Sequence, residues 1–164
     1  MKATPKFTAF LAGLLMAAVP VMAAALPAIP LTLPDGTESS IGDSTLAGVP
    51  EAKASAAAHG ETHEYAGVSL LAALKAAGLK TAENLRGPAL RLVVVATAAD
   101  GYVVTFSLAE LDPTIGAKQV LLVHSVDGSP LPESTGPWRL VVPGDSRPAR
   151  WVRALQRISI RDLH

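Results

Sequence analysis

The chain has 164 residues, and its 14 Lys and Arg side chains balance its 14 Asp and Glu side chains, so the formal net charge is zero. This balance argues against a nucleic-acid-binding protein, because binding to phosphate backbones draws on an excess of basic residues. The chain contains no cysteine, which excludes disulfide bonds and thiolate metal ligands.

The first 25 residues have the three-part pattern of a secretory signal peptide. Two lysines begin it, an uncharged apolar run covers residues 7–22, and alanines follow at positions 23–25. The apolar run is shorter than the roughly 20 residues that a membrane-spanning helix needs, which favours a cleaved leader over an anchor. We therefore expect cleavage after Ala23 or Ala25 and a single domain over residues 26–164. The mature protein is expected to be periplasmic or secreted, without membrane attachment.

The segment after the leader predicts strands. Residues Ile29–Leu33 alternate and end at Pro34-Asp35-Gly36, which is typical of a strand that enters a turn. Residues 35–50 are polar and rich in glycine, with a short helical turn expected near Ser44–Ala47. The alanines of Glu51–Ala58 favour a helix, but the segment is bounded like a strand and is assigned as one.

Val68–Ala77 is predicted to be the main helix. Its leucines recur at helical spacing, Ser69 can cap its start, and Gly78 can end it.

The second half predicts further strands. The Asp100-Gly101 turn joins the first two of them as a hairpin, and Ser107–Leu111 is expected to form a capped helical turn. The expected strands are Leu90–Thr97, Tyr102–Phe106, Gln119–Val126, Trp138–Val142 and Ile158–Ile160. The pattern indicates one α+β domain with a mixed, mainly antiparallel sheet and one main helix.

A set of short motifs runs through residues 29–161 in a fixed order. They are Tyr65–Leu71 with Ala77-Gly78, Ala99–Tyr102, Phe106–Leu111, Asp127–Leu131, Gly136–Pro143 and Arg147–Trp151. Together they resemble the small exported members of the sulfite oxidase-like, molybdopterin-binding oxidoreductase domain family. The resemblance implies the fold of that molybdopterin-binding domain and, for the full family, an oxidoreductase activity.

The C-terminal motif carries the functional part of the resemblance. The family has an arginine three residues before a lysine-tryptophan pair; Arg147 matches that arginine, Arg150 takes the lysine position, and Trp151 matches the tryptophan. The family uses this region to hold the anionic pterin phosphate, to which a guanidinium offers paired donors. The alternative is that both arginines are solvated side chains beside a core tryptophan.

Two departures from the family pattern alter what the resemblance implies. The molybdenum-ligand cysteine, which the family carries upstream of the motif matched by Tyr65–Leu71, is absent, and the leader lacks an arginine pair. We expect a binding module without a cofactor, which binds an anionic small molecule or a periplasmic protein partner. The alternative is an oxidoreductase, or an oxidoreductase subunit, that binds molybdopterin without a cysteine ligand.

Asp100 and Tyr102 are further candidates for the ligand groove, together with Arg147 and Arg150. A carboxylate and a phenol there could lie at the mouth of the groove. The same residues also suit a plain turn with a cross-strand partner.

His59 and His63 form the one cluster with metal-ligand chemistry. On a strand these two imidazoles and Glu61 would share a face, and zinc or copper accepts such ligands. A second alternative function is therefore a metal-binding periplasmic protein. The competing interpretation is a polar loop before the helix.

Overall fold

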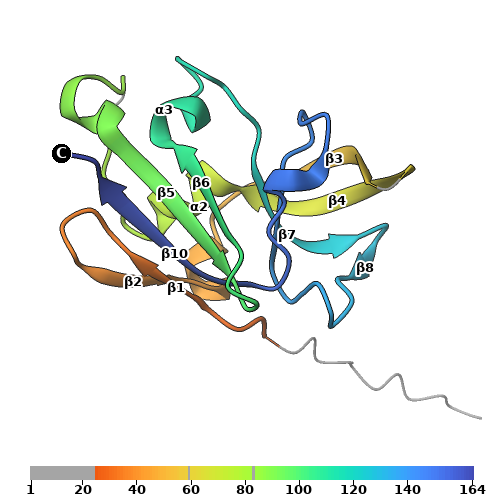
Figure 1. Cartoon of the computed structure of the whole chain (residues 1–164). Coiled ribbons are helices and arrows are strands. Elements are labelled where there is room, and N and C mark those ends of the chain that lie inside the picture. Colours follow the sequence, from red (N-terminus) through yellow and green to blue (C-terminus); the bar gives the residue numbers. More distant parts are fainter. Residues whose placement is uncertain (1–24, 59, 83) are drawn as a thin grey trace, which may run out of the picture.

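The computed structural model describes residues 25–58, 60–82 and 84–164. The predicted leader falls on residues outside this range up to position 24, and so does His59. Within the described residues, ten strands form two five-stranded sheets, and Figure 1 shows them side by side. None of the helices in this part of the chain is long and apolar enough to span a lipid bilayer.

The first sheet has the strand order β2-β1-β10-β5-β6. Its strands are β1 (Ile29–Thr32), β2 (Glu38–Ile41), β5 (Leu92–Ala98), β6 (Val103–Ser107) and β10 (Leu155–Asp162). The β1–β10 pair is parallel and the other pairs are antiparallel. Along β5 every second side chain is buried, which is the alternation of a strand with one face on the core.

The second sheet is built around β7, which pairs with three strands. Its members are β3 (Glu51–Ala58), β4 (Glu61–Ser69), β7 (Leu121–Val126), β8 (Ser129–Pro130) and β9 (Arg139–Val141). Each pairing is antiparallel. The turn from β7 to β8 uses Asp127 and Gly128 at φ 49° and 76°, the backbone that Asp-Gly favours in tight hairpins.

Short helices connect these strands. The α-helices are α1 (Asp43–Leu46), α2 (Leu70–Ala76) and α3 (Leu108–Leu111), and the 3-10 helices are η1 (Gly87–Arg91) and η2 (Pro148–Arg150). Ser107 and Glu110 form a reciprocal capping box on α3. Gly78 follows α2 at φ 108°, a conformation that favours glycine.

One hydrophobic core joins the two sheets. It contains Val94 and Ile158 from the first sheet and Leu122 and Leu140 from the second, all at most 1% exposed. Trp138, 2% exposed, is among the largest side chains of this core. Burying an aliphatic side chain of this kind contributes about 1.5 to 3 kcal/mol, so this core can hold the domain without disulfides.

The structure confirms the α+β class, the mainly antiparallel pairing, the strand at Glu51–Ala58, the β5–β6 hairpin and the capped turn. The predicted start of the main helix at Val68 is wrong. Val68 and Ser69 pair with Leu122 and Leu121 as the end of β4, and the helix begins at Leu70. The helical spacing of the leucines extended the prediction into the strand.

The polar-loop interpretation of residues 61–64 is also wrong, because they belong to β4 and pair with β3. Strands β2 and β8 were not predicted. Both are short and polar, and neither has an apolar pattern of its own that would predict a strand. Their pairing with β1 and β7 is what stabilises them.

Candidate functional site

A groove with a cavity of about 530 Å³ lies where the β5–β6 turn meets the segment around η2. Asp100 and Tyr102 reach it from the turn. Three arginines line the same cavity, and Trp151 also contributes to its wall. The arginines are Arg139, Arg147 and Arg153.

Backbone contacts fix this meeting point. Leu140 of β9 and Val152 exchange both backbone hydrogen bonds, at 2.8 and 3.1 Å. The N–H of Ala99 donates to the carbonyl oxygen of Ala154 at 3.0 Å. The segment that carries η2 is therefore attached both to the second sheet and to the hairpin turn of the first.

Arg139 is the most constrained of the three arginines. Its guanidinium carbon lies 5.0 Å from the Trp151 ring centroid and 5.6 Å from that of Tyr65, and the two rings pack edge to face. Burial lowers the pKa of Arg139 from its ordinary value, and the nearby charge of Arg153 acts in the same direction. Its Nε is buried and has no hydrogen-bond partner among the described residues.

Tyr102 and Asp100 are brought to the groove as expected, and they also make the turn. The Tyr102 hydroxyl donates to the carbonyl oxygen of Ala149 at 2.5 Å, and the Tyr102 N–H donates to the Asp100 carboxylate at 2.9 Å. Tyr102 stays 49% exposed, so the phenol edge of the groove is open to solvent. The two interpretations of these residues are therefore compatible.

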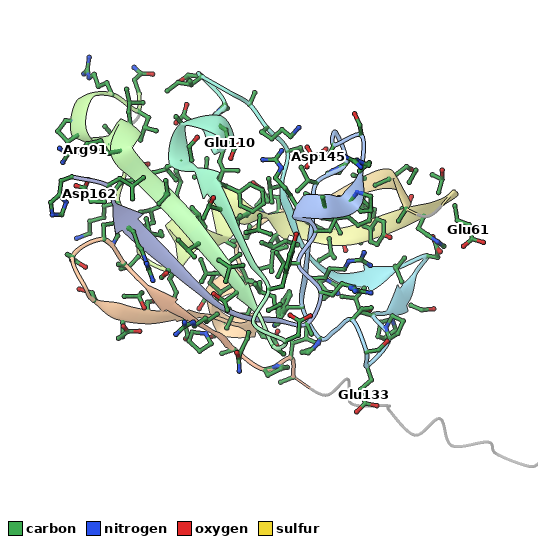
Figure 2. All side chains as sticks on the ribbon, viewed as in Figure 1. Glu61, Arg91, Glu110, Glu133, Asp145 and Asp162 are labelled. Carbon is green, nitrogen blue, oxygen red and sulfur yellow. The ribbon has the colours of Figure 1, made fainter. Side chains whose placement is uncertain are left out.

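Arg150 does not line the cavity, in contrast to Arg147. Its Nε and one terminal nitrogen donate to the two carboxylate oxygens of Asp145 at 2.8 and 2.7 Å. Its other terminal nitrogen donates to Glu110 at 3.2 Å. Figure 2 shows Glu110 and Asp145 on the same side of the molecule. Arg150 thus ties η2 to α3 and to the loop after β9.

This ion-pair cluster, formed by Arg150, Asp145, Glu110 and Lys118, shifts the pKa values of its members. Hydrogen bonds from Arg150, and then from Lys118 at 2.8 Å, lower the pKa of Asp145 to about 2. The same Asp145 contact raises the pKa of Arg150 further above its ordinary value. Asp145 therefore pairs with Arg150, while Arg147 lines the groove and forms no ion pair among the described residues.

The comparison with protein families identifies the domain. The family model of the oxidoreductase molybdopterin binding domain matches residues 41–164. The chain belongs to this family. Membership implies molybdopterin binding, and it gives no support to the expectation of a domain without a cofactor.

Among solved structures, the crystal structure of the sulfane dehydrogenase SoxCD from Paracoccus pantotrophus is similar to this chain, with a TM-score of 0.61 and 20% sequence identity. The match covers 82% of this chain and 38% of that chain, so this protein spans less than half the length of that one. At this identity the likeness shows the sulfite oxidase-like fold alone. No curated protein matches the chain.

The side chains of this chain limit which cofactor groups it could bind. The sequence offers no thiolate, and no three His, Asp or Glu side chains among the described residues are grouped to hold a metal ion. The groove offers guanidinium donors and an unpartnered Arg139 Nε instead. The residues present fit an anionic group and do not fit a thiolate-bound metal centre.

The candidate metal ligand His63 lies on β4, away from the groove lining. Its Nδ1 lies 2.7 Å from the Asp127 carboxylate, and its Nε2 lies 3.6 Å from Glu61. The N–H of Glu64 and then the His63 ring lower the pKa of Asp127. His59 lies outside the described residues, so the proposed pair of imidazoles stays a prediction.

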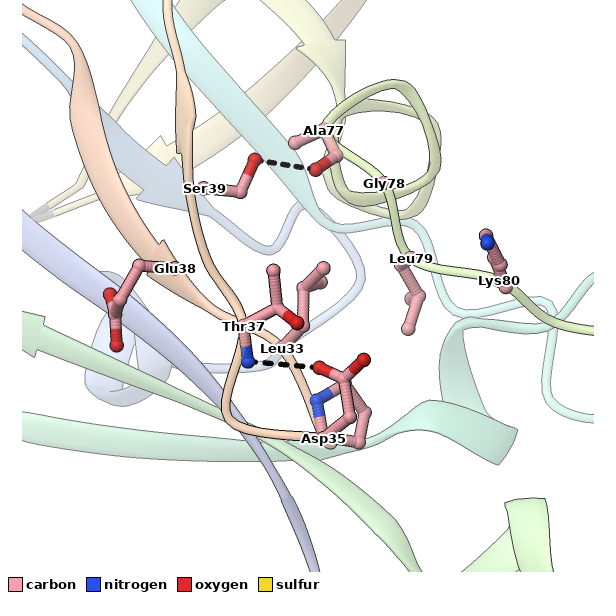
Figure 3. Close-up of a pocket in the computed structure, with 10 residues that line it drawn as sticks. Leu33, Asp35, Thr37, Glu38, Ser39, Ala77, Gly78, Leu79 and Lys80 are labelled. Atoms are coloured by element: carbon pink, nitrogen blue, oxygen red, sulfur yellow. Dashed lines mark hydrogen bonds between the residues drawn. The ribbon is translucent and has the colours of Figure 1, made fainter.

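A second cavity, of about 510 Å³, lies between the β1–β2 turn and the end of α2. Figure 3 shows two hydrogen bonds within it: Ser39 donates to the Ala77 carbonyl at 2.7 Å, and the Thr37 N–H donates to Asp35 at 2.9 Å. Its wall carries the carboxylates of Asp35 and Glu38 and the ammonium group of Lys80, so it lacks the excess of positive charge that three arginines give the other groove.

Arg139 and Arg153 are the groove residues that the sequence analysis did not select. Arg139 had a signal, since it is the one charged residue inside the apolar strand around Trp138–Val142. Its neighbours Trp138 and Leu140 are buried, which turns Arg139 to the other face of β9. Arg153 had no comparable signal, because it stands in an irregular segment.

Proposed function

We propose that this protein is an exported member of the molybdopterin-binding oxidoreductase domain family that binds an anionic small molecule in the arginine groove, without thiolate-bound metal chemistry. The observation that supports it most is the convergence of three arginines on one cavity that a single carboxylate, Asp100, also lines. Among the described residues none of these three arginines forms an ion pair, whereas Arg150 forms two.

Each groove residue has a distinct part in this proposal. Arg139 is held in place by two aromatic faces, so little side-chain freedom is lost when it binds a ligand. The exposed Arg147 and Arg153 would close around the anion from η2 and the segment after it. A guanidinium suits oxyanions because its N–H groups form two parallel hydrogen bonds.

A periplasmic partner with an acidic segment would be recognised by the same arginines. A small molecule is the favoured ligand, because the cavity of about 530 Å³ has the size of a small-molecule site.

The second candidate function is an oxidoreductase, or a subunit of one, that binds molybdopterin without a cysteine ligand. The family match over residues 41–164 favours it. Elemental analysis and pterin fluorescence of protein purified from its native cell envelope decide between the two candidates. Stoichiometric molybdenum or pterin would establish the second one, and the absence of both would leave the anion-binding module.

The groove proposal predicts charge-dependent binding of an inorganic probe. In calorimetric titration with phosphate at constant ionic strength, Arg139→Ala should weaken binding about tenfold, because a hydrogen bond to a charged group contributes about 1.5 to 3 kcal/mol. Arg147→Ala and Arg153→Ala should each weaken it about fivefold, since both side chains are exposed and more screened.

Arg161→Ala is the matched control, because Arg161 is exposed on β10 and does not line the groove. It removes the same charge from the protein as the groove variants do. Equal phosphate affinity in all four variants would contradict the proposed groove.

A further inference from the structure

The chain that leads into β1 is held on the domain from Leu26 onward. The backbone N–H of Leu26 donates to the Asp43 carboxylate at 3.2 Å, and the Pro27 carbonyl accepts from Trp138 Nε1 at 2.8 Å. The Leu26 side chain also packs against the hydrophobic core. Figure 1 shows this segment entering β1 along the lower edge of the first sheet. These contacts fix the position of the Leu26 nitrogen.

The surroundings of this nitrogen carry negative charge. A cavity of about 480 Å³ lies beside Leu26, and both Asp43 of α1 and Glu51 of β3 line it. No lysine or arginine lines it, and its remaining titratable side chain is His124 of β7, edge to face with Trp138. Lys53 reaches Glu51 at 4.0 Å from the same strand. Among the described residues, Asp43 has no partner other than the Leu26 N–H.

We propose that a leader peptidase hydrolyses the Ala25–Leu26 peptide bond and that the ammonium group created at Leu26 pairs with Asp43. The inference rests on the export of the protein stated under the proposed function. Water adds its hydroxyl to the acyl carbon of Ala25 and a hydrogen to the nitrogen of Leu26. The new carboxylic acid gives its proton to the new amine, so the departing leader carries a carboxylate and the domain carries an ammonium.

The residues before this bond and the product of its cleavage both distinguish it from the alternative after Ala23. The bond after Ala25 follows Ala23-Ala24-Ala25, the pattern of small residues at the first and third positions that is typical of leader peptidase sites, whereas the bond after Ala23 has Val21 at the third position. Cleavage after Ala23 would place the ammonium two residues before Leu26 and leave Asp43 facing a neutral peptide N–H. Cleavage after Ala25 supplies a positive charge to the carboxylate, and charge-assisted hydrogen bonds are roughly twice as strong as neutral ones.

The first test identifies the mature N-terminus. The full chain is expressed with its leader, recovered from the cell envelope, and analysed by intact mass and N-terminal sequencing. The expected chain begins at Leu26. A chain that begins at Ala24, or one that keeps its leader, overturns the proposal. Phosphate titration of the same sample reports on the groove independently, so failure of one proposal is distinguished from failure of the other.

The second test uses the charge of the new amine in the processed protein. Near pH 7, Asp43→Asn should lower the melting temperature by about 1 to 4 °C, as expected for one partly exposed ion pair in a domain of this size. An α-amino group has an ordinary pKa of about 7.7 to 8.0, and an adjacent carboxylate keeps it protonated to higher pH. The ion pair between the amine and Asp43 therefore stabilises the protein fully below the ordinary pKa of the amine. This stabilisation is lost as the pH rises through the raised pKa, to about 10.

Glu133→Gln is the control, because Glu133 is exposed and does not line the cavity beside Leu26. The Asp43→Asn difference, corrected by this control, should disappear near pH 10. A difference that is the same at both pH values would indicate a plain N–H hydrogen bond and would overturn the ammonium pairing.

Discussion

Replacing Arg150 with alanine is expected to lower the free energy of unfolding by about 2 kcal/mol, since it removes hydrogen bonds between charged groups. Arg150 donates twice to Asp145 and once to Glu110, and its guanidinium carbon lies 5.3 Å from the Phe106 ring centroid. Its loss also leaves Asp145, whose side chain is 13% exposed, with Lys118 alone. Urea unfolding of the wild type and the variant measures the change.

Arg150→Lys separates charge from geometry. A lysine keeps the positive charge but cannot form the paired hydrogen bonds of a guanidinium, so its stability should fall between those of the wild type and Arg150→Ala. A lysine variant as unstable as the alanine variant would assign the whole effect to the paired geometry. If both variants were as stable as the wild type, the conclusion that the ion-pair cluster stabilises the fold would be wrong.

The same cluster predicts a dependence of stability on pH. The Arg150 hydrogen bonds lower the pKa of Asp145 from 3.8 to about 2. A carboxyl group with a lowered folded-state pKa stabilises the protein above its unfolded pKa, and this contribution, on the order of 2 kcal/mol, is lost as the pH falls through the folded value. The stability difference between the wild type and Asp145→Asn should therefore shrink between about pH 4 and about pH 2.

Replacing Gly67 with alanine is expected to destabilise the domain by about 3 kcal/mol or more, because overpacking against backbone cannot be relieved by a rotamer change. Gly67 lies toward the C-terminal end of β4, at the irregularity where β4 pairs with β7. An added Cβ would overlap the carbonyl oxygen of Leu122 and would lie 2.6 Å from the Cα of Val123. The expected result is a large decrease in the urea concentration at the midpoint of unfolding, or failure to accumulate folded protein.

Gly48→Ala is the matched control for this variant. An added Cβ at Gly48 meets no atom within 4 Å, so its effect should stay within about 0.5 kcal/mol. If the Gly67 variant were as stable as this control, the close approach of β4 and β7 would be wrong.

Several elements follow from local sequence patterns alone. The alternation in β5, the Asp100-Gly101 turn and the Ser107–Glu110 capping box each rest on residues close in the chain. For the same reason the β5–β6 hairpin and the α3 turn were predicted with nearly correct bounds. Local patterns failed at β4, whose polar start forms a strand because β3 pairs with it.

The residues of the candidate site were likewise predicted only in part. The sequence indicated Arg147, Tyr102 and Asp100, and all three line one cavity. It also indicated Arg150, but Asp145 and Glu110 engage that guanidinium instead. Glu110 is 40 positions away from Arg150, and no local pattern predicts a contact of that kind.

The sequence by itself determined the absence of a thiolate, the balanced charge, the class of fold and the motifs of the family. Only the tertiary structure decided which arginines share a groove and which one forms a structural ion pair. It also placed the Leu26 nitrogen beside Asp43, 17 positions away. The physical reason is that residue type and local spacing set backbone propensity, whereas burial and charge neighbours depend on contacts between distant segments.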